Sequence, residues 1–170
     1  MSEPSLRRAT AADAAAIAQL VERAYEKYVQ RIGRRPAPMD ADHAALIENA
    51  NVWVLTEDDR LLGSLVTLVM DDHLLLESIA VAPGAQGRGL GALLMRRAED
   101  DAHDAGRTEV RLYTNAAMTE NIAMYPRFGY VETHRGGQDG FRRVFFTKKL
   151  PAGWGYRPAE GEGESEATRE

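Results

Sequence analysis

The chain has 170 residues, of which 44% are hydrophobic and 28% are charged, and its formal net charge is −5. This composition is typical of one folded globular domain and excludes a disordered or collagen-like chain. The absence of cysteine excludes a disulfide scaffold, a thiolate metal site and a cysteine nucleophile. The sequence has no basic stripe of the kind that binds nucleic acid and no apolar stretch long enough to span a bilayer. We therefore expect a cytoplasmic protein without nucleic-acid or membrane partners, and its four scattered histidines predict no metal site.

Apolar residues at helical spacing predict a first helix over residues 11–29. Thr10 and Asp13 form a capping-box-like start for this helix. The glycine and prolines of residues 33–38 end it. Asp40 is then expected to cap a short second helix that runs through Ile47.

Three strands are expected next, over residues 51–56, 61–70 and 73–81. The third strand is apolar on both faces, which is typical of a central strand. A helix is expected over residues 89–105. Its inner face is expected to hold Leu90, Leu93, Leu94 and Ala98, and its outer face Arg96, Arg97, Asp100 and Asp101.

The remaining elements are a strand over residues 109–113, a helix over 119–128, and a hairpin of residues 130–134 and 141–149. Pro126 has no N–H to donate, so the helix should be kinked or end early. The order of elements predicts a single α/β domain over residues 1–150, in which helices cover both faces of one sheet. Residues 151–170 are acidic and rich in glycine and glutamate, and we expect a flexible tail whose Trp154 and Tyr156 pack onto the domain.

A glycine-dense loop follows the expected central strand and reads Gln86-Gly-Arg-Gly89-Leu-Gly91. Glycine lets a backbone approach a ligand closely, and the N–H groups at the start of a helix favour an anion. These features predict a diphosphate-binding site. The loop lacks the Gly-Lys-Ser/Thr ending of a nucleotide-binding P-loop and the glycine spacing of a dinucleotide-binding loop.

Two further stretches accompany this loop. Val81-Ala-Pro83 stands just before it, and Tyr125-Pro-Arg-Phe-Gly129-Tyr130 follows about forty residues later. Over residues 6–150 the chain thereby resembles the GNAT acetyltransferase superfamily, whose patterns are Gln/Arg-x-x-Gly-x-Gly/Ala, a preceding Val-x-Pro and a later Tyr-x-x-x-Gly-Phe/Tyr. The chain departs from the family at Met118 and Asn121, where the family usually has asparagine and alanine.

The resemblance implies a mixed, mostly antiparallel central sheet and an N-acetyltransferase that uses acetyl-CoA. In that reaction a primary amine attacks the thioester directly, through a tetrahedral intermediate. Tyr125 is then the acid for the leaving thiolate, and a backbone N–H near Val81 donates to the tetrahedral oxygen. The implied cofactor-binding residues are Ile79, Ala80, Val81, Gln86, Gly87, Arg88, Gly89, Leu90, Gly91, Ala92, Asn121 and Tyr125.

Glu77 is a carboxylate within an otherwise apolar strand, and it is the candidate general base. Two alternatives stay open, an ion pair with a helix arginine and a role limited to shaping the groove. A water relay could also accept the proton of the amine. Asp72 and His73, at the start of the same strand, are weaker candidates for the base.

The family resemblance places the acceptor groove beside the first two helices. We expect Tyr28, Arg31, Met39 and Glu77 to bind the acceptor. Lys27, Arg34 and Arg35 join Arg31 in a basic cluster that is either a solvated face or a contact for a carboxylate on the acceptor. The glycine-rich loop over residues 135–141 is expected to form a mobile opposite wall.

The expected acceptor is a small primary amine or an amino-acid-like molecule. A protein N-terminus or a lysine stays open as acceptor, and so does a non-catalytic module that senses acyl-CoA. Many family members form homodimers, and the sequence leaves both the monomer and the homodimer open.

Overall fold

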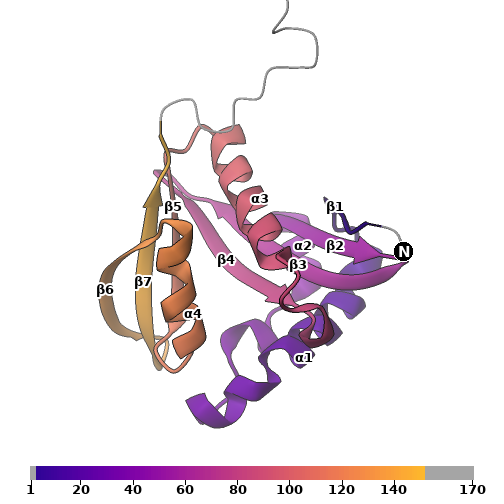
Figure 1. Ribbon diagram of the computed structural model, residues 1–170, viewed down its shortest axis with the longest axis horizontal. Helices are drawn as coiled ribbons and strands as arrows, with labels where there is room; N and C mark the ends of the chain where they lie inside the picture. The colour runs from indigo at the N-terminus through magenta and orange to yellow at the C-terminus, as the bar shows by residue number, and fades with distance from the viewer. Residues whose placement is uncertain (1–2, 152–170) are drawn as a thin grey trace, which may run out of the picture.

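The computed structural model describes residues 3–151, which form one seven-stranded sheet with helices on both faces (Figure 1). The strands are β1 (Ser5–Arg8), β2 (Asn51–Glu57), β3 (Arg60–Val69), β4 (Leu74–Val81), β5 (Glu109–Asn115), β6 (Val131–Gln138) and β7 (Phe141–Lys149). Their order in the sheet is β1-β2-β3-β4-β5-β7-β6, and every neighbouring pair is antiparallel except β4 and β5. The expected mixed, mostly antiparallel sheet is therefore confirmed.

Four α-helices connect and cover the strands. They are α1 (Ala14–Ile32), α2 (His43–Asn49), α3 (Leu90–Asp104) and α4 (Thr119–Met124). Short 3₁₀ turns are η1 (Ala11–Asp13), η2 (Ala37–Asp40), η3 (Pro83–Ala85) and η4 (Tyr125–Phe128). The tail expected over residues 151–170, with Trp154 and Tyr156, lies outside the described residues except for Pro151.

The sheet separates two hydrophobic cores. On one face, Leu94 and Ala98 of α3 are fully buried against strand residues such as Leu65. On the other face, Ile17 and Leu20 of α1 are buried, and residues of α2 pack against the same cluster. These cores hold the helices on the two faces by burying apolar surface, the main favourable contribution to folding.

Local hydrogen bonds set the helix boundaries. The Asp13 carboxylate accepts from the backbone N–H of Thr10 at 2.7 Å and pairs with Arg7 at 2.8 Å, so a 3₁₀ turn precedes α1. The helix ends at Gly33, whose φ of 81° lies in the left-handed region. The expected cap of α2 was wrong: the side chain of Asp42, not Asp40, accepts from an N–H of the first turn.

The outer face predicted for α3 is also wrong in part. Asp101 is buried, and its carboxylate accepts from Thr67 Oγ1 at 2.7 Å and from Trp53 Nε1 at 3.0 Å. It also pairs with Arg97 at 3.0 Å. Leu93 was placed inward, but 47% of its surface is exposed.

Three other expectations differ from the structure. β1, which was not expected, pairs with β2 and forms one edge of the sheet. β5 extends two residues beyond Tyr113, to Asn115. Residues 135–138, expected in a mobile loop, belong to β6, so the turn of the hairpin is only Asp139 and Gly140, with φ of 53° and 80°. Such a two-residue turn with positive φ is the ordinary connection of a tight hairpin.

Candidate active site

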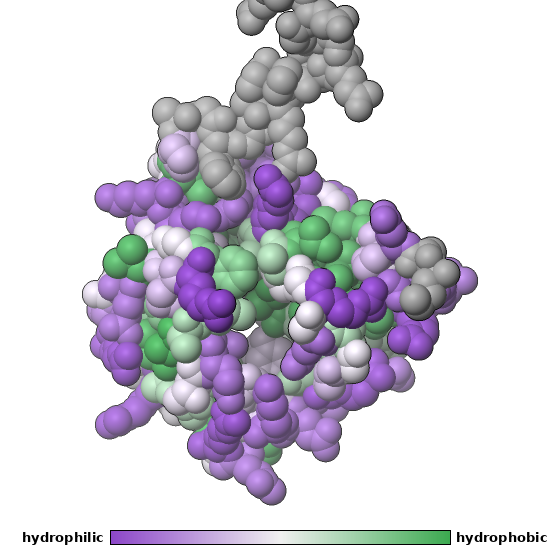
Figure 2. Space-filling view, in the orientation of Figure 1, coloured by the Kyte–Doolittle hydropathy of each residue, from purple (hydrophilic) through white to green (hydrophobic). Residues whose placement is uncertain are grey.

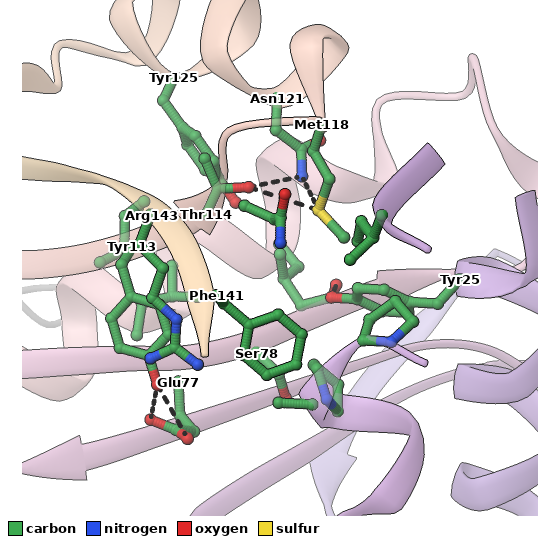
Figure 3. Close-up of a pocket in the computed structure, with 18 residues that line it drawn as sticks. Tyr25, Glu77, Ser78, Tyr113, Thr114, Met118, Asn121, Tyr125, Phe141 and Arg143 are labelled. Atoms are coloured by element: carbon green, nitrogen blue, oxygen red, sulfur yellow. Dashed lines mark hydrogen bonds between the residues drawn. The ribbon is translucent and has the colours of Figure 1, made fainter. Parts of the chain in front are cut away.

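The sheet splits between β4 and β5. These parallel strands pair at two positions, Leu74 with Val110 and Leu75 with Arg111. Beyond Leu75, the edge of β4 that faces β5 has no strand partner in the described part of the chain. A pocket of about 70 Å³ occupies this split, and we call it the inner pocket (Figure 3). Its wall includes Glu77, Ser78, Tyr113, Thr114, Phe141 and Arg143.

A second space of about 390 Å³, the outer cavity, lies between α1, the end of β4, the start of α3 and α4. Tyr25, Ile79, Asn121 and Tyr125 line both spaces. The face drawn in Figure 2 is hollowed near its middle, with hydrophilic side chains on both sides of the hollow and hydrophobic ones above it. Because the two spaces share these four residues, a ligand in the outer cavity can meet a second ligand in the inner pocket there.

The glycine-rich loop forms one end of the outer cavity. Gly87 and Gly89 have φ of 84° and 77°, and α3 begins directly after Gly89. A Cβ on either glycine would meet no atom within 4 Å, so the space in front of the loop is open. The unpaired N–H groups and the dipole of the first turn of α3 favour an anion at this position. These features support the predicted diphosphate site at this loop, which stays a prediction.

Two side chains mark the open edge of β4. Tyr25 Oη donates to the carbonyl oxygen of Ile79 at 2.9 Å, and Gln86 Nε2 donates to that of Val81 at 3.4 Å. In an antiparallel strand the N–H and C=O of one residue point to the same edge. The N–H groups of Ile79 and Val81 therefore face the split as well, where they can donate to carbonyl oxygens of a ligand.

Glu77 lies at a β-bulge in β4. Val66 of β3 is opposite Ser78, and Thr67 is opposite Leu76, so Glu77 is the extra residue between them. A bulge of this kind redirects side chains and is frequent beside active sites.

The bulge changes which face the following residues occupy. Leu76 and Ile79 both pack with the core around α3, although an unbroken strand would place them on opposite faces, and Ala80 packs with the core around α1. At the bulge itself, Glu77 points into the inner pocket, and each of its carboxylate oxygens accepts from Tyr113 Oη at 3.4 Å (Figure 3).

Tyr125 stands where α4 meets a 3₁₀ turn. The α-helix ends at Met124, because Pro126 cannot donate to the helix, and this confirms the predicted early end. The ring of Tyr125 packs against Tyr130 and Phe146, with centroids 5.8 and 5.6 Å apart, and only 4% of the residue is exposed. Burial raises the pKa of Tyr125 above its usual value. Its hydroxyl therefore stays protonated at neutral pH and can serve as a hydrogen-bond donor.

The two positions that depart from the family pattern lie together at the site. Asn121 Nδ2 donates to Thr114 Oγ1 at 3.3 Å and contacts Met118 Sδ at 3.6 Å (Figure 3). Asn121 and Met118 both line the inner pocket, and Asn121 lines the outer cavity too. The departure therefore changes the chemistry of the wall and leaves the pocket itself in place.

The structure brings most of the predicted cofactor-binding residues together. The outer cavity is lined by Ile79, Ala80, Val81, Gln86, Gly87, Gly89, Leu90, Gly91, Ala92, Asn121 and Tyr125. Arg88 is outside this set, because its guanidinium pairs with Glu57 at 2.6 Å.

The predicted acceptor-binding residues separate. Glu77 lines the inner pocket, whereas Tyr28 lines the outer cavity. Arg31 pairs with Glu120 of α4 at 2.6 Å, and Met39 packs against the core around α1. Neither Arg31 nor Met39 lines either space.

Asp72 and His73, the weaker candidates for the base, lie outside both spaces. Their side chains hydrogen-bond to each other at 2.6 Å, and this contact lowers the pKa of Asp72. This hydrogen bond between two neighbouring residues is typical of a turn, as the alternative to a catalytic role.

The sequence analysis assigned no role to several residues of the inner pocket, among them Tyr25, Tyr113 and Arg143, and it expected Phe141 only as the end of a loop that forms the opposite wall. Phe141 and Arg143 are both buried and alternate with exposed Arg142 along β7. Period-two alternation from Phe141 would have indicated that Arg143 points inward. No signal in the sequence marks Tyr25, because its hydroxyl reaches β4 only through the packing of α1 on the sheet.

Over residues 3–151, no helix combines the length and apolar character needed to cross a membrane. In the same part of the chain, no three histidine, aspartate or glutamate side chains gather where they could hold a metal ion.

Short stretches of the chain are similar to two curated acetyltransferases. A [ribosomal protein bS18]-alanine N-acetyltransferase of Salmonella typhimurium is 36% identical over 78 residues, and the streptothricin acetyltransferase of Streptomyces lavendulae is 37% identical over 60 residues. These stretches cover 46% and 35% of this chain and 53% and 32% of the relatives. The matches therefore span about half and about a third of the two relatives.

The fold is shared with solved acetyltransferases. PaiA N-acetyltransferase of Thermoplasma acidophilum, solved in complex with coenzyme A, superposes with a TM-score of 0.74 at 14% identity, over 88% of this chain and 100% of that chain. The ribosomal-protein-S18-alanine N-acetyltransferase of Escherichia coli superposes with a TM-score of 0.66 at 20% identity, over 92% and 100%. The family model described as "Acetyltransferase (GNAT) family" matches residues 14–130, well over half of the sequence, and this chain belongs to that family.

Proposed function

We propose that this protein transfers the acetyl group of acetyl-CoA to a primary amine of a small or amino-acid-like acceptor. The observation that carries the proposal is the meeting of two spaces at Tyr25, Ile79, Asn121 and Tyr125. The larger space is bordered by an anion site at the start of a helix, and the smaller one contains a carboxylate. A two-substrate transfer needs two such spaces in contact, because bringing the reactants together supplies much of the rate enhancement.

The outer cavity fits a CoA derivative in its chemistry. The loop that contains Gly87 and Gly89 would hold the diphosphate, and the N–H groups on the edge of β4 would hold amide and thioester oxygens. Acetyl-CoA supplies the acetyl group as a thioester that an amine can attack. The N–H of Val81 would stabilise negative charge on the carbonyl oxygen during that attack.

Two side chains would manage the protons. Glu77 lies in the inner pocket, where its carboxylate can accept the proton of the amine directly or through water. Tyr125 lines both spaces and is kept neutral by burial, so it can donate to the leaving sulfur. A thiol has a pKa of about 8.5, well below that of a buried tyrosine, so Tyr125 would act mainly as a hydrogen-bond donor to the thiolate.

The size and the wall of the inner pocket favour a small acceptor. The pocket has a volume of about 70 Å³. The guanidinium of Arg34 lies 4.0 Å over the ring of Phe141, a residue of the pocket wall, and this contact joins the connection between α1 and η2 to the start of β7. A long peptide would have to displace this contact to enter.

Acetylation of a protein N-terminus is the second candidate function. It is favoured by the 36% identity to the [ribosomal protein bS18]-alanine N-acetyltransferase over 78 residues. A non-catalytic acyl-CoA sensor would need the loop of the outer cavity but not the polar groups of Glu77 and Tyr125.

The test is release of free CoA thiol from acetyl-CoA in the presence of amines, amino acids and peptides, with CoA binding measured separately by calorimetry. Turnover of a small amine supports the proposal, and turnover of peptides alone supports the second candidate. Binding of CoA without any turnover supports the sensor, and failure to bind CoA refutes all three.

The variant that accompanies this assay is Tyr125→Phe. It should lower kcat by about 10²–10³-fold, which is the usual contribution of one hydrogen-bond donor to a charge that develops in the transition state. Affinity for CoA should change little, because only the hydroxyl is removed. A kcat within twofold of the parent protein would move the donor role to another residue.

A further inference from the structure

The inner pocket contains a buried cation. Arg143 of β7 is 7% exposed and lines this pocket. The face of its guanidinium lies 4.2 Å from the centroid of the Tyr113 ring, and Phe141 packs beside it at 5.4 Å. Its Nη1 donates to Gln138 Oε1 at 2.9 Å. The charge is therefore held in one place by rings and by a neutral amide.

No carboxylate forms an ion pair with Arg143 in the described part of the chain. Arginine has five N–H donors, and a buried charge is costly unless it is paired and hydrogen-bonded. The hydrogen bond to Gln138 and the contacts with the aromatic rings offset part of the cost of burying the charge. Arg143 lines the pocket, so its guanidinium can donate further hydrogen bonds to a ligand there.

Glu77 is the other charged group that lines the pocket, and Tyr113 stands between the two charges. Tyr113 Oη contacts both oxygens of Glu77 at 3.4 Å, and the ring of Tyr113 carries Arg143 on its face. The wall thus presents one negative and one positive group, each in contact with Tyr113, and Figure 3 labels all three residues. A ligand with one ammonium and one carboxylate has the complementary pair of charges.

None of the four members of the basic cluster, Lys27, Arg31, Arg34 and Arg35, lines the inner pocket, and Lys27 lines the outer cavity instead. Arg31 pairs with Glu120, and Arg35 pairs with both Glu22 and Asp40 at 2.9 Å. Arg34 covers the ring of Phe141 in the wall of the pocket. A carboxylate contact was one of the two alternatives for this cluster, and Arg143, which lines the inner pocket, is better placed for it.

We propose that the acceptor is an amine that also carries a carboxylate, as an amino acid does, and that Arg143 binds this carboxylate in the inner pocket. The inference rests on the proposed acetyl transfer and specifies its substrate class. A planar guanidinium binds a carboxylate through two parallel hydrogen bonds, which would fix the acceptor with its amine toward Glu77 and the outer cavity.

The test compares each of several amino acids with its carboxamide and with the amine left after decarboxylation. Binding of each compound to the CoA-saturated protein is measured by calorimetry, and kcat/KM is measured by thiol release. The free acid should be preferred by roughly 10- to 100-fold over its amide, the usual worth of hydrogen bonds to a charged group. This comparison needs no variant, so it does not depend on how a variant folds.

Arg143→Met should abolish the preference, mainly through a higher KM for the acid, and leave the KM for acetyl-CoA unchanged. Arg143→Lys should restore part of the preference, because it keeps the charge without the planar fork. Arg142→Met is the matched control on the same strand, since Arg142 is exposed, and it should keep the full preference. The ratio of acid to amide is independent of the fraction of folded protein.

Equal binding of acid and amide, or a preference that survives in Arg143→Met, overturns the inference. Turnover of amines irrespective of the carboxylate would leave the proposed acetyl transfer standing while it refutes the role of Arg143. Peptides that bind better than free amino acids would also refute that role and favour a protein acceptor. If nothing is acetylated, the calorimetric comparison still decides whether the pocket recognises a carboxylate.

Discussion

Gly89 and Gly106 allow the anion site to be tested with a built-in control. They flank the two ends of α3, with φ of 77° and 70°, and a Cβ on either would meet no protein atom within 4 Å. Substitution by alanine therefore costs backbone strain alone, about 1–2 kcal/mol for a non-glycine residue in the left-handed region. For a domain of this size each kcal/mol corresponds to a fall in Tm of roughly 2–4 °C.

The two variants should differ only when CoA is present. At Gly89 the added methyl group occupies the open space in front of the first turn of α3, where the diphosphate is expected. Displacing one charge-assisted hydrogen bond costs about 1.5–3 kcal/mol, which corresponds to a Kd roughly 10- to 150-fold higher. At Gly106 the methyl group lies at the far end of the helix and should leave the Kd unchanged.

The measurements are thermal unfolding without ligand and calorimetric titration with CoA. Both variants should show a similar fall in Tm, and only Gly89→Ala should weaken CoA binding. Gly89→Glu places a carboxylate in the same space and should abolish binding while the fold remains. The argument fails if Gly89→Ala binds CoA as the parent protein does, or if both alanine variants weaken CoA binding equally.

Two other predictions concern carboxylates. Glu77→Gln keeps the shape of the side chain but cannot accept a proton, so kcat near pH 7 should fall by about 10²–10⁴-fold. The difference in kcat between the variant and the parent should narrow toward pH 10, because the free amine becomes abundant there. A kcat within twofold of the parent at every pH would assign the base to a water relay. Hydrogen bonds from Arg7 lower the pKa of Asp13 to about 2 in the folded protein. Because the pKa of Asp13 is lower in the folded state than in the unfolded state, the unfolded state binds more protons as the pH falls. The contribution of Asp13 to the stability of the protein is therefore present above about pH 4 and is lost toward pH 2. The urea midpoint should therefore fall less steeply between pH 4 and pH 2 in Asp13→Asn than in the parent protein, and identical slopes would exclude this contribution.

The sequence was informative where local rules decide the structure. Glycine spacing located the loop over residues 86–91, and the missing N–H of Pro126 correctly predicted the early end of α4. Strand alternation found β2 to β5 to within two residues at each end. These features depend on neighbours in the chain and on backbone sterics.

What the sequence could not show depends on partners far along the chain. Asp101 follows an outward-facing helical pattern, yet Thr67 and Trp53 from two strands bury and satisfy it. β1 is four residues long and includes two arginines, so only its pairing with β2 identifies it as a strand. The inner pocket likewise exists because β4 and β5 part after two pairs, which no local pattern encodes.

The bulge at Glu77 adds a carboxylate to β4 without altering the ladder between β3 and β4. An unbroken strand would put Leu76 and Ala80 on one face, and the extra residue places them in the cores around α3 and α1 instead. Deleting Glu77 would bring Ser78 next to Leu76, and these residues could keep their partners Val66 and Thr67 in a regular register. The deletion is therefore expected to remove the carboxylate and keep the packing of both cores. An engineer who reshapes the acceptor specificity of this scaffold can thus vary this position in side-chain chemistry and also in strand length.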